Sequence, residues 1–309
     1  MNRTTATVLG MCLCLAASAA ARDGVMRLDP LRRTTQRVIP CAIPDFVGGR
    51  GEIAGTVRGD LTRYGTFVDA RIRPADMAKL DRADRRKGEL HARNWANLGA
   101  QVVGKGTVEE SGAQVSIRFE LYTPHNGRRV FARRYRGPAS GMRMIGHRIA
   151  DDIVEAILKE KGFFATRLLF VQGNYRAKNV WICDSDGHNA RALTHGDSLC
   201  IFPDWFPDGK RILFTSYFEG RPLMYEMTLS SGRTTRLLAL PGMNTSGAVS
   251  PDGTHLAAIL DKDGHPELYV ATLGGRRLRR LTRSRAVESS PTWSPDSGRL
   301  AYTSDASEG

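Results

Sequence analysis

The spacing of apolar side chains divides the chain into two parts. In residues 36–164, several stretches repeat with the period of a helix that is apolar on one side. The segment 52–64 has such a stripe, closed by Gly65, and 140–161 has a longer one, closed by Gly162. The stripes consist of Ile53, Val57 and Leu61 in the first segment and of Ile145, Ile149, Ile153 and Ile157 in the second. We expect both helices to bury these side chains against a sheet.

Strand patterns accompany these helices. A short apolar strand is expected over 37–43, interrupted by Pro40, and weaker helices over 75–86 and 89–98. The second turn of a three-stranded meander contains Asn126-Gly127, a pair that adopts the positive φ of tight hairpin turns. The three strands of this meander are 101–108, 114–122 and 129–135. Together these patterns predict a small α+β domain over 36–164.

Residues 165–309 show short strands and polar turns, and one motif occurs three times. Each copy places a Pro-Asp corner between two apolar strands, because Pro presets φ for a turn and Asp favours the corner. The motif prolines are Pro207, Pro251 and Pro295, so both intervals are 44 residues. A period of about 40 to 50 residues is typical of β-propeller blades. Further strands are expected at 167–172, 179–183, 190–193, 223–229, 234–238, 267–272 and 278–281.

Residues 1–21 have the features of a cleavable export signal. Arg3 supplies the positive charge, 8–16 form a short apolar core, and 17–21 offer small-residue cleavage sites. A membrane anchor is the rival interpretation, but a spanning helix needs about 20 apolar residues. Lipid attachment through Cys12 or Cys14 is a third option. We expect export, a mature chain that begins near residue 20 or 22, and no membrane-spanning segment.

Beyond this signal the cysteines are Cys41, Cys183 and Cys200, with no C-x-x-C spacing. An odd number without that spacing argues against a metal knuckle or a disulfide scaffold. A bridge between Cys183 and Cys200 is an alternative in an oxidising compartment. Three buried free thiols are favoured, because free Cys packs as a small hydrophobe.

The formal net charge of +13 suits an anionic partner such as nucleic acid, a membrane surface or an acidic protein. The arginines are scattered, however, without the aromatic interleaving of a single-strand binder. A solvated basic surface explains this balance, and we expect no nucleic-acid partner.

The context of the chain's cofactor-like and metal-like motifs does not support catalysis. Gly49-x-Gly51-x-x-Ala54 imitates a dinucleotide fingerprint, but prolines spoil the strand that must precede it. Asp184-x-Asp186-Gly187 and Asp261-x-Asp263-Gly264 lack the full ligand set of a calcium loop, so hairpin turns explain them. No nucleophile elbow, His-Glu-x-x-His or Walker motif occurs. We expect no catalytic residues, no cofactor and no metal.

Several segments together resemble the TolB family. They are 51–61 with Gly65, 94–103 with its Trp-x-x-Leu-Gly, Gly146-His147 with Asp151, and Thr166-Arg167 ahead of the Pro-Asp repeats. The resemblance implies an α+β N-terminal domain (36–164) followed by an all-β propeller (165–309). The family closes about six blades, whereas this sequence stops after the third motif, so we expect about three of six. Because open blades expose strand edges, a truncated product is favoured over a sheet completed in trans.

The resemblance also implies two partner-binding segments. Loops at one mouth of the propeller would receive a Pal-like lipoprotein, and a mobile strand within 22–35 would bind a TolA-like inner-membrane protein. At the mouth the matching residues are Leu199, Ile201, Phe202, Met243, Asn244, Ser246, Glu288 and Ser289. In the N-terminal strand they are Arg22, Asp23, Val25, Met26 and Leu28. Ordinary loop residues and a flexible terminus are the alternatives.

On this resemblance the chain would be a non-enzymatic periplasmic scaffold of the Tol-Pal system. It would support outer-membrane integrity and envelope constriction during cell division, with other outer-membrane proteins as further partners. The alternative is the propeller cap of a truncated exported peptidase or hydrolase, whose catalytic domain would follow residue 309. The meander-and-helix unit that precedes the repeats argues against such a cap.

Overall fold

The computed structural model describes residues 38–49, 51–274 and 277–306. The predicted export signal and the predicted N-terminal strand, with Arg22, Asp23, Val25, Met26 and Leu28, lie outside the described residues. Among the helices of the described ranges, none combines the length and the apolar character that a membrane crossing requires.

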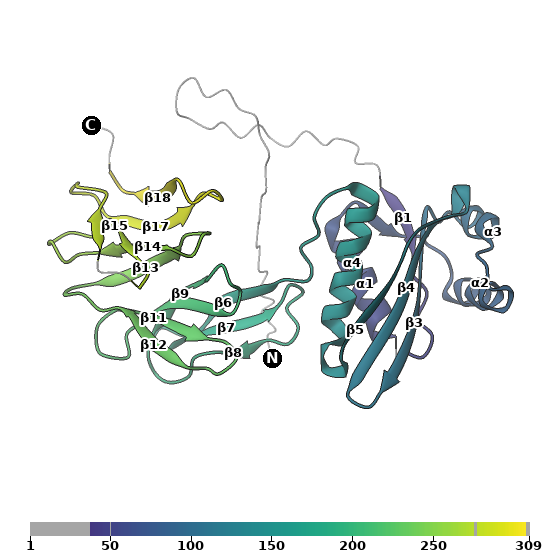
Figure 1. Cartoon of the computed structure of the whole chain (residues 1–309), viewed down its shortest axis with the longest axis horizontal. Coiled ribbons are helices and arrows are strands. Elements are labelled where there is room, and N and C mark those ends of the chain that lie inside the picture. The colour runs from purple at the N-terminus through teal and green to yellow at the C-terminus, as the bar shows by residue number, and fades with distance from the viewer. Residues whose placement is uncertain (1–37, 50, 275–276, 307–309) are drawn as a thin grey trace, which may run out of the picture. The chain divides into compact units, whose positions relative to one another are not determined.

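A mixed five-stranded sheet forms the framework of the N-terminal part (Figure 1). Its strands are β1 Ile39–Ala42, β2 Phe67–Asp69, β3 Val102–Ser111, β4 Gln114–Thr123 and β5 Arg128–Pro138, in the spatial order β2-β1-β3-β4-β5. β1 runs parallel to both of its neighbours, whereas β3, β4 and β5 form the predicted antiparallel meander. β2 was not predicted, because three residues are too few for an alternating pattern to be recognised.

Helices cover this sheet. They are α1 Glu52–Tyr64, α2 Pro74–Lys87, α3 Ala92–Asn97 and α4 Met142–Leu158, with the short 3-10 helices η1 Pro124–Asn126 and η2 Ala139–Gly141. α1 and α4 lie side by side (Figure 1) and bury the predicted apolar stripes against Ile117, Phe119 and Leu121 of β4. α4 ends earlier than predicted because Lys159 takes the left-handed conformation, so Ile157 near this end is only half-buried.

Small antiparallel sheets make up the second part (Figure 1). The first contains β6 Arg167–Gly173, β7 Lys178–Asp184 and β8 Arg191–Ala192. Two four-stranded sheets follow, one of β9 Cys200–Trp205, β10 Arg211–Ser216, β11 Leu223–Thr228 and β12 Thr234–Leu238, the other of β13 Asn244–Val249, β14 His255–Leu260, β15 Glu267–Thr272 and β16 Leu278–Arg280. The last described sheet pairs β17 Glu288–Trp293 with β18 Leu300–Ser304. The predicted fold class, an α+β part followed by an incomplete all-β propeller, is confirmed.

The 44-residue period of the motif holds for the strands themselves. β9, β13 and β17 begin at residues 200, 244 and 288, and each Pro-Asp corner joins such a first strand to the second strand of its sheet. β6 begins at residue 167, 44 residues before β10, so it is equivalent to a second strand. The sheet of β6, β7 and β8 therefore has no counterpart of β9 within the described ranges.

The three cysteines of the described chain are buried and unpaired, as predicted. Burial, together with the nearby carboxylate of Asp69, raises the pKa of the Cys41 thiol to about 12. Cys183 and Cys200 form no bridge, and burial also raises the pKa of Cys183. These thiols therefore act as small apolar side chains of the core.

Candidate functional site

Three residues at the same position of successive sheets have a left-handed backbone. They are Phe202 in β9, Ser246 in β13 and Ser290 in β17, with φ of 53°, 50° and 50°. At each of them the pairing with the second strand is shifted, which is a β-bulge. A left-handed residue other than glycine costs about 1 kcal/mol or more. Strain that recurs at one position of three sheets marks this end of the first strands as a candidate functional surface.

Hydrogen bonds join adjacent first strands near the bulges. The N–H of Ser290 donates to Oγ of Ser246 at 3.2 Å, which links β17 to β13. The backbone of Val249 in β13 donates to the carboxylate of Asp204 in β9. Burial outweighs that bond and raises the pKa of Asp204 above its ordinary value. The three first strands are thus directly connected to one another.

Exposed aromatic side chains gather at the bulged end. Phe202 is 48% exposed, and Phe218 and Tyr175 are each 80% exposed. Because β9 and β10 are antiparallel, the loop after β10, with Phe218, lies beside the start of β9, where the N–H of Tyr217 donates to the carbonyl of Leu199 at 3.0 Å. Tyr175 occupies the equivalent loop after β6. Exposed aromatic side chains are enriched in protein-binding surfaces.

Only some of the predicted mouth residues belong to this surface. Phe202 and Ser246 form bulges, and Leu199 and Ile201 are half-buried beside them. Ser290 completes the set but was not predicted, although its distance of 44 residues from Ser246 is the signal that identifies it. Phe218 and Tyr175 were missed because they belong to different loops of the sequence.

Two other predicted residues brace the loop before β13. The side chain of Asn244 is fully buried, with Oδ1 accepting from the N–H of Leu240 at 2.9 Å and Nδ2 donating to the carbonyls of Leu240 and Gly242. The backbone N–H of Met243 donates to the carboxylate of Asp261. Asn244 therefore holds the shape of the loop and offers no side-chain atom to a partner in this conformation.

Glu288 and Ser289, at the start of β17, also make their contacts within the chain. Glu288 is 3% exposed and accepts a hydrogen bond from Oγ of Ser284 at 3.1 Å. Its other carboxylate oxygen has no hydrogen-bond partner among the residues that the structure describes. Oγ of Ser289 lies 2.6 Å from Oγ1 of Thr303 in β18. The candidate surface consequently rests on bulged backbone and exposed aromatic rings.

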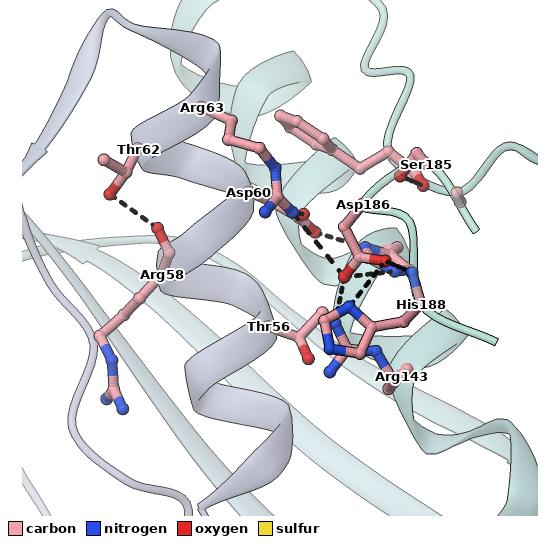
Figure 2. Close-up of polar contacts among 12 residues, drawn as sticks. Thr56, Arg58, Asp60, Thr62, Arg63, Arg143, Ser185, Asp186 and His188 are labelled. Atoms are coloured by element: carbon pink, nitrogen blue, oxygen red, sulfur yellow. Dashed lines mark hydrogen bonds and ion pairs between the residues drawn. The ribbon is translucent and has the colours of Figure 1, made fainter. Parts of the chain in front are cut away.

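A second group of polar side chains lies where α1 and α4 meet the turn between β7 and β8 (Figure 2). Nδ1 of His147 is 2.6 Å from Oδ2 of Asp60, and Nε2 is 3.6 Å from Oδ2 of Asp186. None of the three side chains is more than 1% exposed. Arg63 pairs with Asp60, and Arg143 pairs with Asp186. Asp186 lies in the predicted hairpin turn, and its carboxylate also anchors that turn to the helices.

The Asp60, His147 and Asp186 group has the composition of a metal site, and its ligand atoms all lie within 4.8 Å of one another. Each carboxylate is already neutralised by a guanidinium, however, so a divalent cation would meet two positive charges. Burial by itself raises the pKa of Asp186, but the N–H of His188 and the guanidinium of Arg143 outweigh it and hold this pKa below its ordinary value. The group is a buried ionic network.

Comparison with known proteins gives one family for both parts of the chain. The profile of the TolB amino-terminal domain matches residues 31–130, and that of the TolB beta propeller domain matches residues 154–309. The Tol-Pal system protein TolB of Cereibacter sphaeroides is 34% identical over 249 residues, which cover 77% of this chain and 55% of that protein. The Tol-Pal system protein TolB of Hahella chejuensis is 32% identical over 238 residues, which cover 75% and 55%.

The chain spans about half the length of these curated relatives. Among solved structures, TolB from Acinetobacter baumannii superimposes with a TM-score of 0.77 at 25% identity. That superposition covers 88% of this chain and 67% of the other.

Proposed function

We propose, since this chain belongs to the TolB family, that it is a non-enzymatic protein-binding component of a Tol-Pal system. Its relatives are named as Tol-Pal system proteins, which supports the assignment to that system. The candidate surface at the bulged end supports a role in protein binding. The observation that carries the proposal is the row of bulges with Phe202, Phe218 and Tyr175 exposed beside it. Exposed aromatic rings suit the recognition of a protein partner.

The partner proposed for this surface is a Pal-like lipoprotein. Phe202, Phe218 and Tyr175 would supply the apolar contact area, because burial of one aromatic side chain contributes about 1.5 to 3 kcal/mol. The hydrogen bond from the N–H of Ser290 to Oγ of Ser246 would hold the first strands β13 and β17 next to each other. Asn244 would act indirectly, because its hydrogen bonds to Leu240 hold the loop before β13 in one conformation.

The remaining parts of the proposal rest on the sequence and the family. Export to the periplasm is supported by the features of residues 1–21, and a TolA-like inner-membrane protein would bind within 22–35. In the cell such a component would support outer-membrane integrity and envelope constriction during division. Other outer-membrane proteins would be further partners.

The test is capture of a Pal-like lipoprotein by the tagged full chain from an envelope extract, followed by titration of the purified lipoprotein. Phe202→Ser is the informative variant, because Ser occupies the equivalent bulge at 246 and 290 and is compatible with that backbone. Loss of the half-exposed ring should weaken binding at least about tenfold, which corresponds to about 1.4 kcal/mol. The melting temperature should stay unchanged.

Leu98→Ser is the matched control, because Leu98 is 41% exposed and lies in the N-terminal part at the end of α3. It should leave the affinity unchanged. A folded chain that captures no lipoprotein would contradict the proposed partner. Equal affinity of Phe202→Ser and the parent chain would move the binding site away from the bulged end.

A further inference from the structure

The last strand of the N-terminal sheet is rich in arginine. Five of the eleven residues of β5 are arginines, namely Arg128, Arg129, Arg133, Arg134 and Arg136. β5 pairs with β4 on one side, and on its other side no backbone hydrogen bond reaches it from the described residues. A free edge of this kind presents N–H and C=O groups that can pair with a further strand.

The arginines of β5 divide between the two faces of the sheet. Arg133 points to the face covered by α4, where its guanidinium donates to the carboxylate of Asp152. Arg134 and Arg136 point to the opposite face, because successive side chains of a strand alternate. The residue of β4 directly opposite Arg134 is Arg118, which shares that face. The uncovered face at this edge is therefore basic.

This arrangement is unfavourable for the isolated chain. Two like charges directly opposite each other on adjacent strands destabilise a sheet, and Arg118 faces Arg134 in this way. Arg118 and Arg129 share one carboxylate, that of Glu120, at 3.0 Å and 3.4 Å. Arg134 and Arg136 have no carboxylate within ion-pair distance in the described part of the chain. The positive charge of Arg134 and Arg136 at this edge is therefore not compensated by a carboxylate of the described residues.

We propose that the free edge of β5 binds an acidic peptide in extended conformation, which adds to the sheet as a further strand. Residues i and i+2 of a strand are ~6.7 Å apart, so acidic side chains at alternate positions would face Arg134 and Arg136. The backbone of the peptide would complete the hydrogen-bond ladder of β5. Guanidinium groups bind carboxylates with two parallel hydrogen bonds. The same arginines repel a basic strand, which makes the edge selective for acidic partners.

The test uses the full chain and a fluorescent eight-residue peptide of alternating Glu and Val, with anisotropy as the readout. The peptide should bind, and the double variant Arg134→Glu/Arg136→Glu should weaken binding at least about tenfold. Arg279→Glu/Arg283→Glu changes the charge by the same amount at exposed positions of the propeller and should change affinity less than about twofold. Because all four arginines are exposed, melting curves of both variants should match the parent chain.

A peptide N-methylated at alternate residues separates strand addition from simple charge attraction, and it is measured on the unchanged chain. It should bind at least about tenfold more weakly, since it keeps its charge and loses backbone donors. Equal binding of the methylated peptide would overturn strand addition. Binding to phosphatidylglycerol vesicles in the absence of peptide binding would also overturn it, because the basic face would then recognise a lipid surface.

Discussion

Replacement of Asp186 by Ala should lower the free energy of unfolding by about 3 kcal/mol. The carboxylate is 1% exposed, accepts the N–H of His188 at 3.1 Å and pairs with Arg143. Its removal leaves the guanidinium of Arg143 without a counter-charge, and Nε of Arg143 already lacks a hydrogen-bond partner among the described residues. Breaking a buried ion pair costs about 3 to 5 kcal/mol. Arg143 is still 19% exposed, so water partly solvates it, and we expect a loss at the lower end of this range.

A double-mutant cycle with Arg143→Met measures this pair directly, by urea unfolding followed with circular dichroism. Arg143→Met removes the guanidinium that Asp186→Ala leaves without a partner. The double variant should therefore lower the free energy of unfolding by less than the sum of the two single variants, with a coupling energy of about 2 kcal/mol. Asp186→Asn is the control for shape, because an amide oxygen can still accept the N–H of His188. Asp186→Asn should lower the free energy of unfolding by less than Asp186→Ala does.

The pH dependence gives an independent check. The pKa of Asp186 is held below its ordinary value in the folded chain, so the stabilisation by its carboxylate is present above the unfolded pKa near 3.8. This stabilisation is lost as the pH falls through the folded pKa. The difference in free energy of unfolding between the parent chain and Asp186→Asn should therefore decrease at acid pH. Two results would refute the role of the buried ionic network in stability. They are additive effects of Asp186→Ala and Arg143→Met on the free energy of unfolding, and a loss below about 1 kcal/mol for Asp186→Ala.

Two further substitutions test the packing and the burial of charge. A Cβ at Gly106 would overlap the ring of Phe46, which is 3% exposed and cannot withdraw, so Gly106→Ala should cost about 1 to 3 kcal/mol in urea unfolding. Gly55→Ala in α1, with open space around its Cβ, is the control and should not destabilise. The pKa of Asp204 is raised by burial, so the folded chain loses stability as the pH rises through that pKa. In thermal melts, Asp204→Asn should thus gain stability relative to the parent chain as the pH rises above the unfolded pKa near 3.8, and a difference that is constant with pH would contradict the raised pKa.

The amino-acid sequence by itself determined the local elements and the class of the fold. The stripe of Ile53, Val57 and Leu61 predicted α1, and the 44-residue spacing of Pro207, Pro251 and Pro295 predicted the repeated first and second strands. Helix periodicity, strand alternation and turn chemistry depend on residues that are near one another in the chain. The partner-binding strand within 22–35 stays a prediction.

Only the tertiary structure decided which residues share a surface and which are buried. Asp60, His147 and Asp186 come from three distant segments and meet because α1, α4 and the turn after β7 pack together. Asn244 is polar and near a loop, but it is the first residue of β13 and is fully buried. Phe218 reaches the end of the sheet that holds Phe202 through the antiparallel pairing of β9 with β10. Such neighbours depend on how whole strands and helices pack, and no local pattern of side chains records that packing.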